Sequence, residues 1–137
     1  MRLGKNSKAA AISRVPLFGH CTKRQLFEIA QLADELDLPT GKTLTKEGAP
    51  GREFFVILEG CAEVCRNGRP IASMRGGDFF GEIALVTDVA RTATVRTTSE
   101  VRLLVLPSRE FRQLLRTSPD IQGKVLQAVA ERLAAMV

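Results

Sequence analysis

The chain has 137 residues, of which 45% are hydrophobic and 26% are charged, and its net charge is +5. This length and apolar content suit one globular domain with one core. No stretch approaches the ~20 consecutive apolar residues of a membrane-spanning helix, and the first residues lack the apolar core of a signal peptide. We therefore expect a cytoplasmic protein that does not span a membrane.

The basic excess lies at the N-terminus. Six Lys and Arg residues precede the first acidic residue, Glu28, and the other 14 basic and 15 acidic residues leave a net charge of −1. Residues 1–13 have no strong terminal anchor, so we expect a basic, flexible arm. Such an arm can dock on nucleic acid or an anionic surface, but a solvated, loosely ordered arm is the simpler interpretation of this charge.

Three cysteines, Cys21, Cys61 and Cys65, are too few and odd in number for a disulfide framework. With His20 as the only histidine, we expect no metal site and no cofactor. In a strand, Cys61 and Cys65 would share one face about 13 Å apart. Small, half-buried side chains are the simpler interpretation, and a redox or metal pair is the alternative.

The first helix is predicted from the sequence after Thr22. Thr22 and Gln25 have the spacing of a capping box, and apolar residues follow at helical spacing as far as Leu36. Pro39 and Gly41 would end this helix. We therefore expect one amphipathic helix over residues 22–38.

From Lys42 to Leu106 the pattern changes to short β-type runs separated by turn residues. Asn67-Gly68 is the dipeptide best suited to a tight hairpin, because both positions tolerate positive φ. Many short strands at close spacing predict an antiparallel sandwich, roll or barrel. Beyond Pro107 the helical pattern returns, with Ser108 expected to cap a short helix and Ser118 a longer one with an apolar stripe.

The segment 76–95 carries the functional signal. Residues 82–86 suit one or two helical turns, and Gly81 precedes them. A glycine before a short helix lets backbone N–H groups face an anion. Nine residues after Glu82, the planar guanidinium of Arg91 can match two phosphate oxygens.

The motifs FGEIAL and ARTATV in this segment resemble the phosphate-binding cassette of cyclic-nucleotide-binding domains. These domains occur in cAMP receptor proteins, kinase regulatory subunits and nucleotide-gated channels. The runs VPLF, LPTG, KEGAPG and FVILEG also look like that family, so the likeness covers roughly residues 14–136. It implies a mainly β domain over residues 14–137, an eight-stranded antiparallel β-roll with an N-terminal helix, a short cassette helix and C-terminal helices.

The resemblance also implies the site. Glu82 matches the acid that accepts a hydrogen bond from the ribose 2′-hydroxyl, and Arg91 matches the arginine that pairs with the cyclic phosphate as its only buried countercharge. Arg132 and Leu133 on the last helix are candidate base-capping residues. The remaining expected nucleotide-binding residues are Gly81, Ile83, Ala84, Thr92 and Ala93.

The expected ligand is cAMP or cGMP. A 3′,5′-cyclic phosphate carries one negative charge, which one arginine and several oriented amides can neutralise. A linear monophosphate brings extra charge that the site would have to desolvate. Thr92 matches a position where family members that take cGMP often have threonine or serine, but threonine also occurs in domains that respond to cAMP. We favour cAMP and leave cGMP open.

The expected function is a regulatory receptor module in which ligand capture moves the C-terminal helix. An enzyme is disfavoured, because the cassette has no nucleophile with a partner base. The alternatives are a degenerate domain that mediates protein interaction or redox sensing, or a fragment of a larger transcription regulator or channel. The chain itself contains no predicted DNA-binding unit, its downstream protein partner is unknown, and a homodimer is open.

Overall fold

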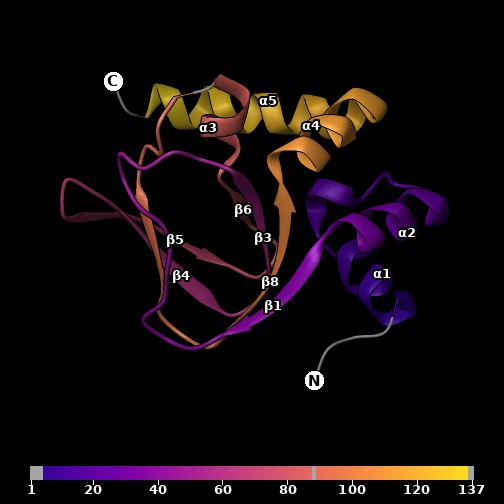
Figure 1. The fold of residues 1–137 in the computed structure, drawn as a ribbon, viewed down its shortest axis with the longest axis horizontal. Coiled ribbons are helices and arrows are strands. Elements are labelled where there is room, and N and C mark those ends of the chain that lie inside the picture. Colours follow the sequence, from indigo (N-terminus) through magenta and orange to yellow (C-terminus); the bar gives the residue numbers. More distant parts are fainter. Residues whose placement is uncertain (1–4, 88, 136–137) are drawn as a thin grey trace.

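The computed structural model describes residues 5–87 and 89–135. Eight antiparallel strands form two four-stranded sheets, in the orders β1-β8-β3-β6 and β2-β7-β4-β5. Together the sheets make the roll that fills one side of Figure 1. The strands are β1 (Asp34–Leu38), β2 (Thr43–Thr45), β3 (Glu53–Glu59), β4 (Cys61–Arg66), β5 (Arg69–Arg75), β6 (Phe79–Phe80), β7 (Thr94–Thr97) and β8 (Val101–Pro107).

Helices flank the roll, as the resemblance implied. Helices α1 and α2 lie together beside it, and α4 and α5 run across its end with α3 against α5 (Figure 1). The fold class predicted from the sequence is therefore confirmed. The helical elements are α1 (Lys5–Ser13), η1 (Pro16–Phe18), α2 (Lys23–Leu32), α3 (Glu82–Thr87), α4 (Ser108–Thr117) and α5 (Pro119–Ala134).

Two apolar clusters hold these elements together. One joins the helices to the outer face of the first sheet, where Phe54 of β3 stacks on Phe111 of α4 with ring centroids 4.3 Å apart. The other fills the roll, where Phe55 stacks on Phe80 at 4.8 Å. Because Phe54 and Phe55 point to opposite faces of one strand, β3 belongs to both clusters.

Three local predictions from turn and cap chemistry are confirmed. The Thr22 side chain accepts from the backbone of Gln25, whose side chain accepts from Thr22 in return. Asn67 and Gly68 have φ angles of 54° and 75° between β4 and β5. The Ser118 side chain accepts a hydrogen bond from the Ile121 backbone at the start of α5.

The predicted boundaries of the first helix were wrong. Helix α2 ends at Leu32, and Asp34–Leu38 instead form strand β1 along β8. Leu36 and Leu38 fit a strand as well as a helix, because both face the apolar cluster inside the roll. The pairing with β8 decides between the two patterns.

The structure also differs from two expectations about helix starts. Residues 5–13 form helix α1, in which Ala9 and Ile12 are buried, so this part of the expected arm packs on the domain; residues 1–4 lie outside the described residues. Helix α4 begins at Ser108 with Pro107 as its N-cap and no side-chain cap. A proline that fixes φ takes the place of the expected serine cap.

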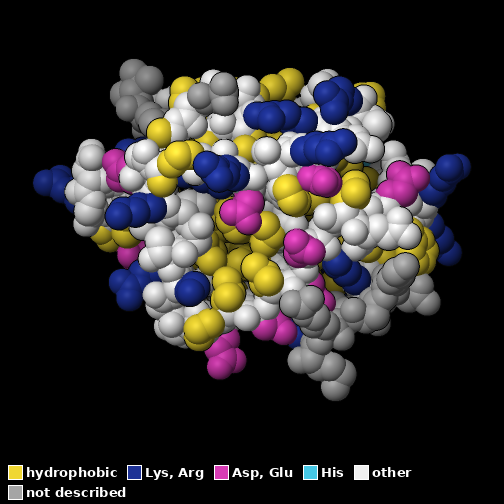
Figure 2. All heavy atoms as spheres, viewed as in Figure 1, with side chains coloured by type: hydrophobic (Ala, Val, Ile, Leu, Met, Phe, Trp, Pro, Cys, Tyr) yellow, Lys and Arg dark blue, Asp and Glu magenta, His cyan; other side chains and the backbone are white. Residues whose placement is uncertain are grey.

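Figure 2 shows that Lys and Arg side chains on this face are interspersed with Asp and Glu side chains and exposed apolar ones. This face of the molecule therefore has no uniform basic surface of the kind that binds nucleic acid backbones. Among the described residues, no helix combines the length and apolar character needed to cross a bilayer.

Candidate functional site

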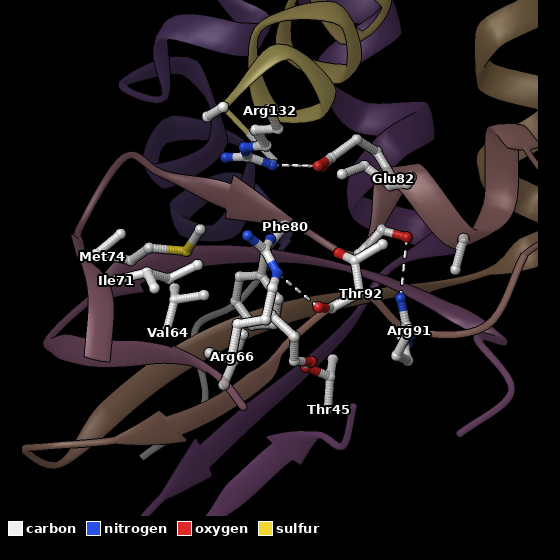
Figure 3. Close-up of a pocket in the computed structure, with 17 residues that line it drawn as sticks. Thr45, Val64, Arg66, Ile71, Met74, Phe80, Glu82, Arg91, Thr92 and Arg132 are labelled. Atoms are coloured by element: carbon white, nitrogen blue, oxygen red, sulfur yellow. Dashed lines mark hydrogen bonds and ion pairs between the residues drawn. The ribbon is translucent and has the colours of Figure 1, made fainter. Parts of the chain in front are cut away.

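A cavity of about 300 Å³ opens between the second sheet, α3 and the end of α5. Its apolar lining comes mainly from β4, β5 and β6, and its charged lining from four side chains (Figure 3). Pockets of ~300–1,000 Å³ with few polar groups on apolar walls are typical of small-molecule sites. The main lining residues are Thr45, Val64, Arg66, Ile71, Met74, Phe80, Glu82, Arg91, Thr92 and Arg132.

Gly81 sets the start of α3 at the cavity. Its φ of +93° lies in the left-handed region, which side chains rarely adopt. A Cβ there would also lie 2.8 Å from both an Arg91 guanidinium nitrogen and the Glu53 carbonyl oxygen. Glycine at this position therefore lets the chain turn into α3 directly above Arg91.

Arg91 is 7% exposed and is held by hydrogen bonds to backbone groups. Its Nη1 donates to the Gly81 carbonyl at 2.9 Å, and its Nη2 donates to the Glu53 carbonyl at 2.7 Å. Its own backbone pairs with Gly48 and Ala49. Burial lowers the pKa of Arg91, and Glu53 and Glu82 oppose this, but a guanidinium stays charged in proteins. The result is a fixed cation beside the cavity.

Glu82 is the first residue of α3 and is 1% exposed. Both of its carboxylate oxygens accept from Nη1 of Arg132, which comes from α5 (Figure 3). Nη2 of Arg132 donates to the Phe79 carbonyl at 2.7 Å, and the guanidinium lies 5.1 Å from the Phe79 ring centroid. These contacts fasten the last helix to the start of α3.

Burial raises the pKa of the Glu82 carboxyl above its ordinary value of 4.5, and the attraction and hydrogen bonds of Arg132 oppose only part of that rise. Because the pKa is raised overall, the ionised form of the Glu82 carboxylate is less stabilised in the protein than in water. A further donor at this carboxylate would therefore stabilise its charged form.

Seven cassette residues predicted from the sequence line the cavity together. Of the two candidate base-capping residues, Arg132 lines it but Leu133 does not, since it is 38% exposed. One step along a helix turns a side chain by about 100°, so Leu133 faces away when Arg132 faces inward. The seven cassette residues are Gly81, Glu82, Ile83, Ala84, Arg91, Thr92 and Ala93.

Sequence reasoning missed Arg66, whose side chain also lines the cavity. Ala62, Val64 and Arg66 alternate along β4, and a period of two places all three on one face. This alternation in the sequence could have indicated that Arg66 faces the inside of the roll. Of the three arginines that line the cavity, Arg91 is the only buried one, and Arg66 and Arg132 are half-buried.

The cysteines lend little support to a redox site. All three are free thiols, with Cys61 exposed and Cys21 and Cys65 half-buried. The Cys65 thiol donates to Glu63 at 3.1 Å, and this hydrogen bond raises the pKa of Cys65. A raised pKa lowers the fraction of reactive thiolate. In the part of the chain that the structure describes, no group of three or more His, Cys, Asp or Glu residues could hold a metal ion.

Comparison with known proteins agrees with this geometry. Residues 35–118 match the model of the "Cyclic nucleotide-binding domain" family. The chain belongs to this family. Its cavity lies where the family's cassette, as matched in the sequence, meets the last helix.

Two curated relatives come from larger proteins. The domain is 37% identical over 125 residues to a putative potassium channel protein of Rhodopseudomonas palustris, covering 88% of this chain and 30% of the channel. It is 36% identical over 108 residues to a cAMP-dependent protein kinase regulatory subunit of Emericella nidulans, covering 77% of this chain and 26% of that subunit. The chain thus spans about a third or less of these two relatives.

Among solved structures, "cAMP bound PfPKA-R (141-441)" superposes with a TM-score of 0.84 at 23% identity. The match covers 96% of this chain and 47% of that one. At this identity the likeness establishes the fold of the domain.

The Glu82–Arg132 contact generates the first prediction. In a double-mutant cycle of Glu82→Gln and Arg132→Met, measured by urea unfolding without ligand, we expect a coupling free energy of about 1–3 kcal/mol, because losing Arg132 leaves a buried carboxylate without its main partner. The exposed Arg24–Glu28 pair, with N and O atoms 3.4 Å apart, is the control, and its cycle should give about 0.3–0.5 kcal/mol. A Glu82–Arg132 coupling no larger than the control would contradict the role given to this contact.

Proposed function

We propose that the domain is a receptor module that binds a 3′,5′-cyclic purine nucleotide, with cAMP as the favoured ligand, and catalyses no reaction. The observation that carries the proposal is the shared cavity of Arg91, Glu82 and an apolar wall. These three features suit the three parts of such a nucleotide: an anionic phosphate, a ribose hydroxyl and a planar base.

The phosphate is assigned to the side of the cavity formed by Gly81, the start of α3 and Arg91. Arg91 is fixed by two carbonyl oxygens, and a guanidinium has five N–H donors, so others remain for phosphate oxygens. The first N–H groups of a helix lack intrahelical partners, which adds donors from Glu82 to Ala84. A fixed cation beside oriented amides matches a phosphate of one negative charge.

The ribose 2′-hydroxyl is assigned to Glu82. Its carboxylate is buried, and both oxygens accept from the same nitrogen of Arg132, so each keeps a lone pair for another donor. A hydroxyl donor at that carboxylate would be a charge-assisted hydrogen bond, of the kind that is stronger than a neutral one. A nucleotide whose only free ribose hydroxyl is the 2′-hydroxyl places one such donor there.

The base is assigned to the apolar wall of Val64, Ile71 and Met74. Kinase regulatory subunits named as cAMP-dependent are among the relatives, and this favours cAMP. Thr92 lines the cavity too, and its hydroxyl keeps cGMP open as a second ligand.

We further propose that binding is coupled to α5 through Glu82. The same carboxylate that would receive the ribose hydroxyl holds Arg132 of α5. A ligand that competes for Glu82 changes the interaction of α5 with the cassette, and differential contacts of this kind shift a conformational equilibrium. Arg132 would then be released to cover the base.

The curated relatives suggest the role of the domain within a larger protein. Channels and kinase subunits are the sources of the curated relatives, so we propose that the module regulates a protein partner or an attached domain in response to the nucleotide, within the cytoplasm.

The phosphate assignment predicts that Arg91→Ala weakens cAMP binding at least ~30-fold in a calorimetric titration, since losing one partner of a hydrogen-bonded charge pair costs ~2–5 kcal/mol. Arg91→Lys keeps the charge without the planar fork and should recover part of the loss. Glu82→Gln should cost ~1–2 kcal/mol, because a neutral amide replaces a charged acceptor.

Arg96→Ala is the matched control, because Arg96 is exposed on β7 and its loss changes the net charge equally. It should bind like the parent. Circular dichroism would verify that each variant is folded. If Arg91→Ala does not fold, Arg91→Lys and Glu82→Gln still test the assignment. Unchanged affinity in the folded Arg91 variants would refute the phosphate assignment.

The coupling predicts that saturating cAMP changes amide hydrogen exchange at the end of α5, near Arg132, by about fivefold or more. Arg132→Met should remove most of this ligand-dependent change, whereas the amides of α2, which does not line the cavity, should stay the same in both proteins. If cAMP leaves the amide exchange rates at the end of α5 unchanged in the parent, coupling through Glu82 is contradicted.

A further inference from the structure

Arg66 is a cavity side chain that the phosphate and ribose assignments do not use. It is the last residue of β4, two residues beyond Val64 and therefore on the same face of the strand. Its Nε donates to the Thr92 carbonyl at 3.0 Å. This bond holds the guanidinium in place while the side chain stays only half-buried.

The two terminal nitrogens of Arg66 have no hydrogen-bond or ion-pair partner within residues 5–87 and 89–135. The other two arginines of the cavity have partners for their terminal nitrogens. Arg132 is paired with Glu82, and Arg91 bonds two carbonyl groups beside the start of α3. Both terminal nitrogens of Arg66 are therefore available to a part of the ligand that Arg91 and Glu82 do not bind.

The position of Arg66 decides which part of a nucleotide it meets. In Figure 3 the guanidinium of Arg66 lies on the opposite side of Thr92 from Arg91, toward Val64 and Met74. The phosphate and ribose are assigned to Arg91 and Glu82, on the other side of Thr92. A base against the apolar wall is then the part of the ligand that presents its edge to Arg66.

We propose that Arg66 contacts the edge of the purine and biases the pocket toward guanine. A guanidinium only donates hydrogen bonds. Guanine offers two adjacent acceptors, O6 and N7, which a guanidinium can bind with two parallel bonds. Adenine offers N7 beside an amino donor, so it accepts one bond and opposes the second. Arg66 is thus a specificity-determining residue, and this inference rests on the proposed function.

The test is a calorimetric titration of the intact chain and of Arg66→Met with cAMP and with cGMP. Arg66→Met should weaken cGMP roughly tenfold or more, the size of one bidentate contact to a base, while the affinity for cAMP changes less than about threefold. The measured quantity is the ratio of the two dissociation constants, and the test compares this ratio between variant and parent. The test is therefore valid whichever nucleotide the parent prefers.

Two further variants separate base reading from other roles. Arg66→Lys keeps the charge and some donors but loses the planar fork and the Nε bond to the Thr92 carbonyl, so it should lose part of the preference. Arg69→Met removes a charge from the exposed paired position on β5 and should leave both affinities as in the parent. Thermal melting of each protein would verify folding.

The outcomes are distinguishable. If Arg66→Met weakens both nucleotides equally, Arg66 acts through the Thr92 backbone or through charge alone, and the inference is wrong. If the parent binds neither nucleotide, the proposed function fails, and the inference fails with it. A selective loss of cGMP in Arg66→Met and Arg66→Lys would support the inference.

Discussion

The buried guanidinium of Arg91 is the interaction on which the rest of the site depends. It joins the carbonyl of Glu53 on β3 to that of Gly81 before α3, and its backbone pairs with the loop that contains Gly48 and Ala49. Three separate segments therefore take their positions from one residue, two through its side chain and one through its backbone. An ionised group can be buried because carbonyl oxygens replace its water, which is the general condition for a stable buried charge.

The close approach of the backbone to Arg91 explains two glycines around it. Gly81 has positive φ and no room for a Cβ, and a Cβ on Gly51 would lie 2.5 Å from that of Ala84 and 3.1 Å from the Arg91 guanidinium. Small residues at these points let the loop, the helix and the cation pack against one another. The part of the site around Arg91 is thus built mainly from backbone groups and small residues.

Glu82 links this fixed part to α5, the helix whose position the proposed coupling would change. A buried carboxylate needs partners, and in this structure its main partner is Arg132 on the last helix. If a ribose hydroxyl becomes a second partner, the strength of the hold on α5 changes without any contact between the nucleotide and the rest of the helix. One buried acid can in this way carry information from the cavity to the end of the chain.

Much of the fold followed from local chemistry that sequence patterns record. The capping box at Thr22, the hairpin at Asn67-Gly68 and the cap at Ser118 need only neighbouring residues, and all three are confirmed. Strand β1 was missed because its identity comes from pairing with β8, some 65 residues away. Helix α1 was missed because burial of Ala9 and Ile12, and not a cap or a strong apolar stripe, holds it in place.

The site shows the same contrast between features set by neighbouring residues and features set by long-range contacts. The seven cassette residues were found because they are contiguous or nearly so and match a family motif, and they do line one cavity. Arg66 was overlooked because its place in the site arises from the pairing of β4 with β7, which brings it beside Thr92, a residue distant in the sequence. Sequence alone does not fix the rotation of α5 about its axis, so it could not show that Arg132 lines the cavity and Leu133 does not.

The central claim is that the cavity accepts a cyclic phosphate of one negative charge with a single free ribose hydroxyl. The most direct test is a calorimetric titration of the intact chain with cAMP and with the linear nucleotide 5′-AMP. The account predicts saturable binding of cAMP and binding of 5′-AMP at least about tenfold weaker, because the additional charge and the 3′-hydroxyl must be desolvated without matching partners. Equal affinities for the two nucleotides, or no binding of cAMP or cGMP, would contradict it.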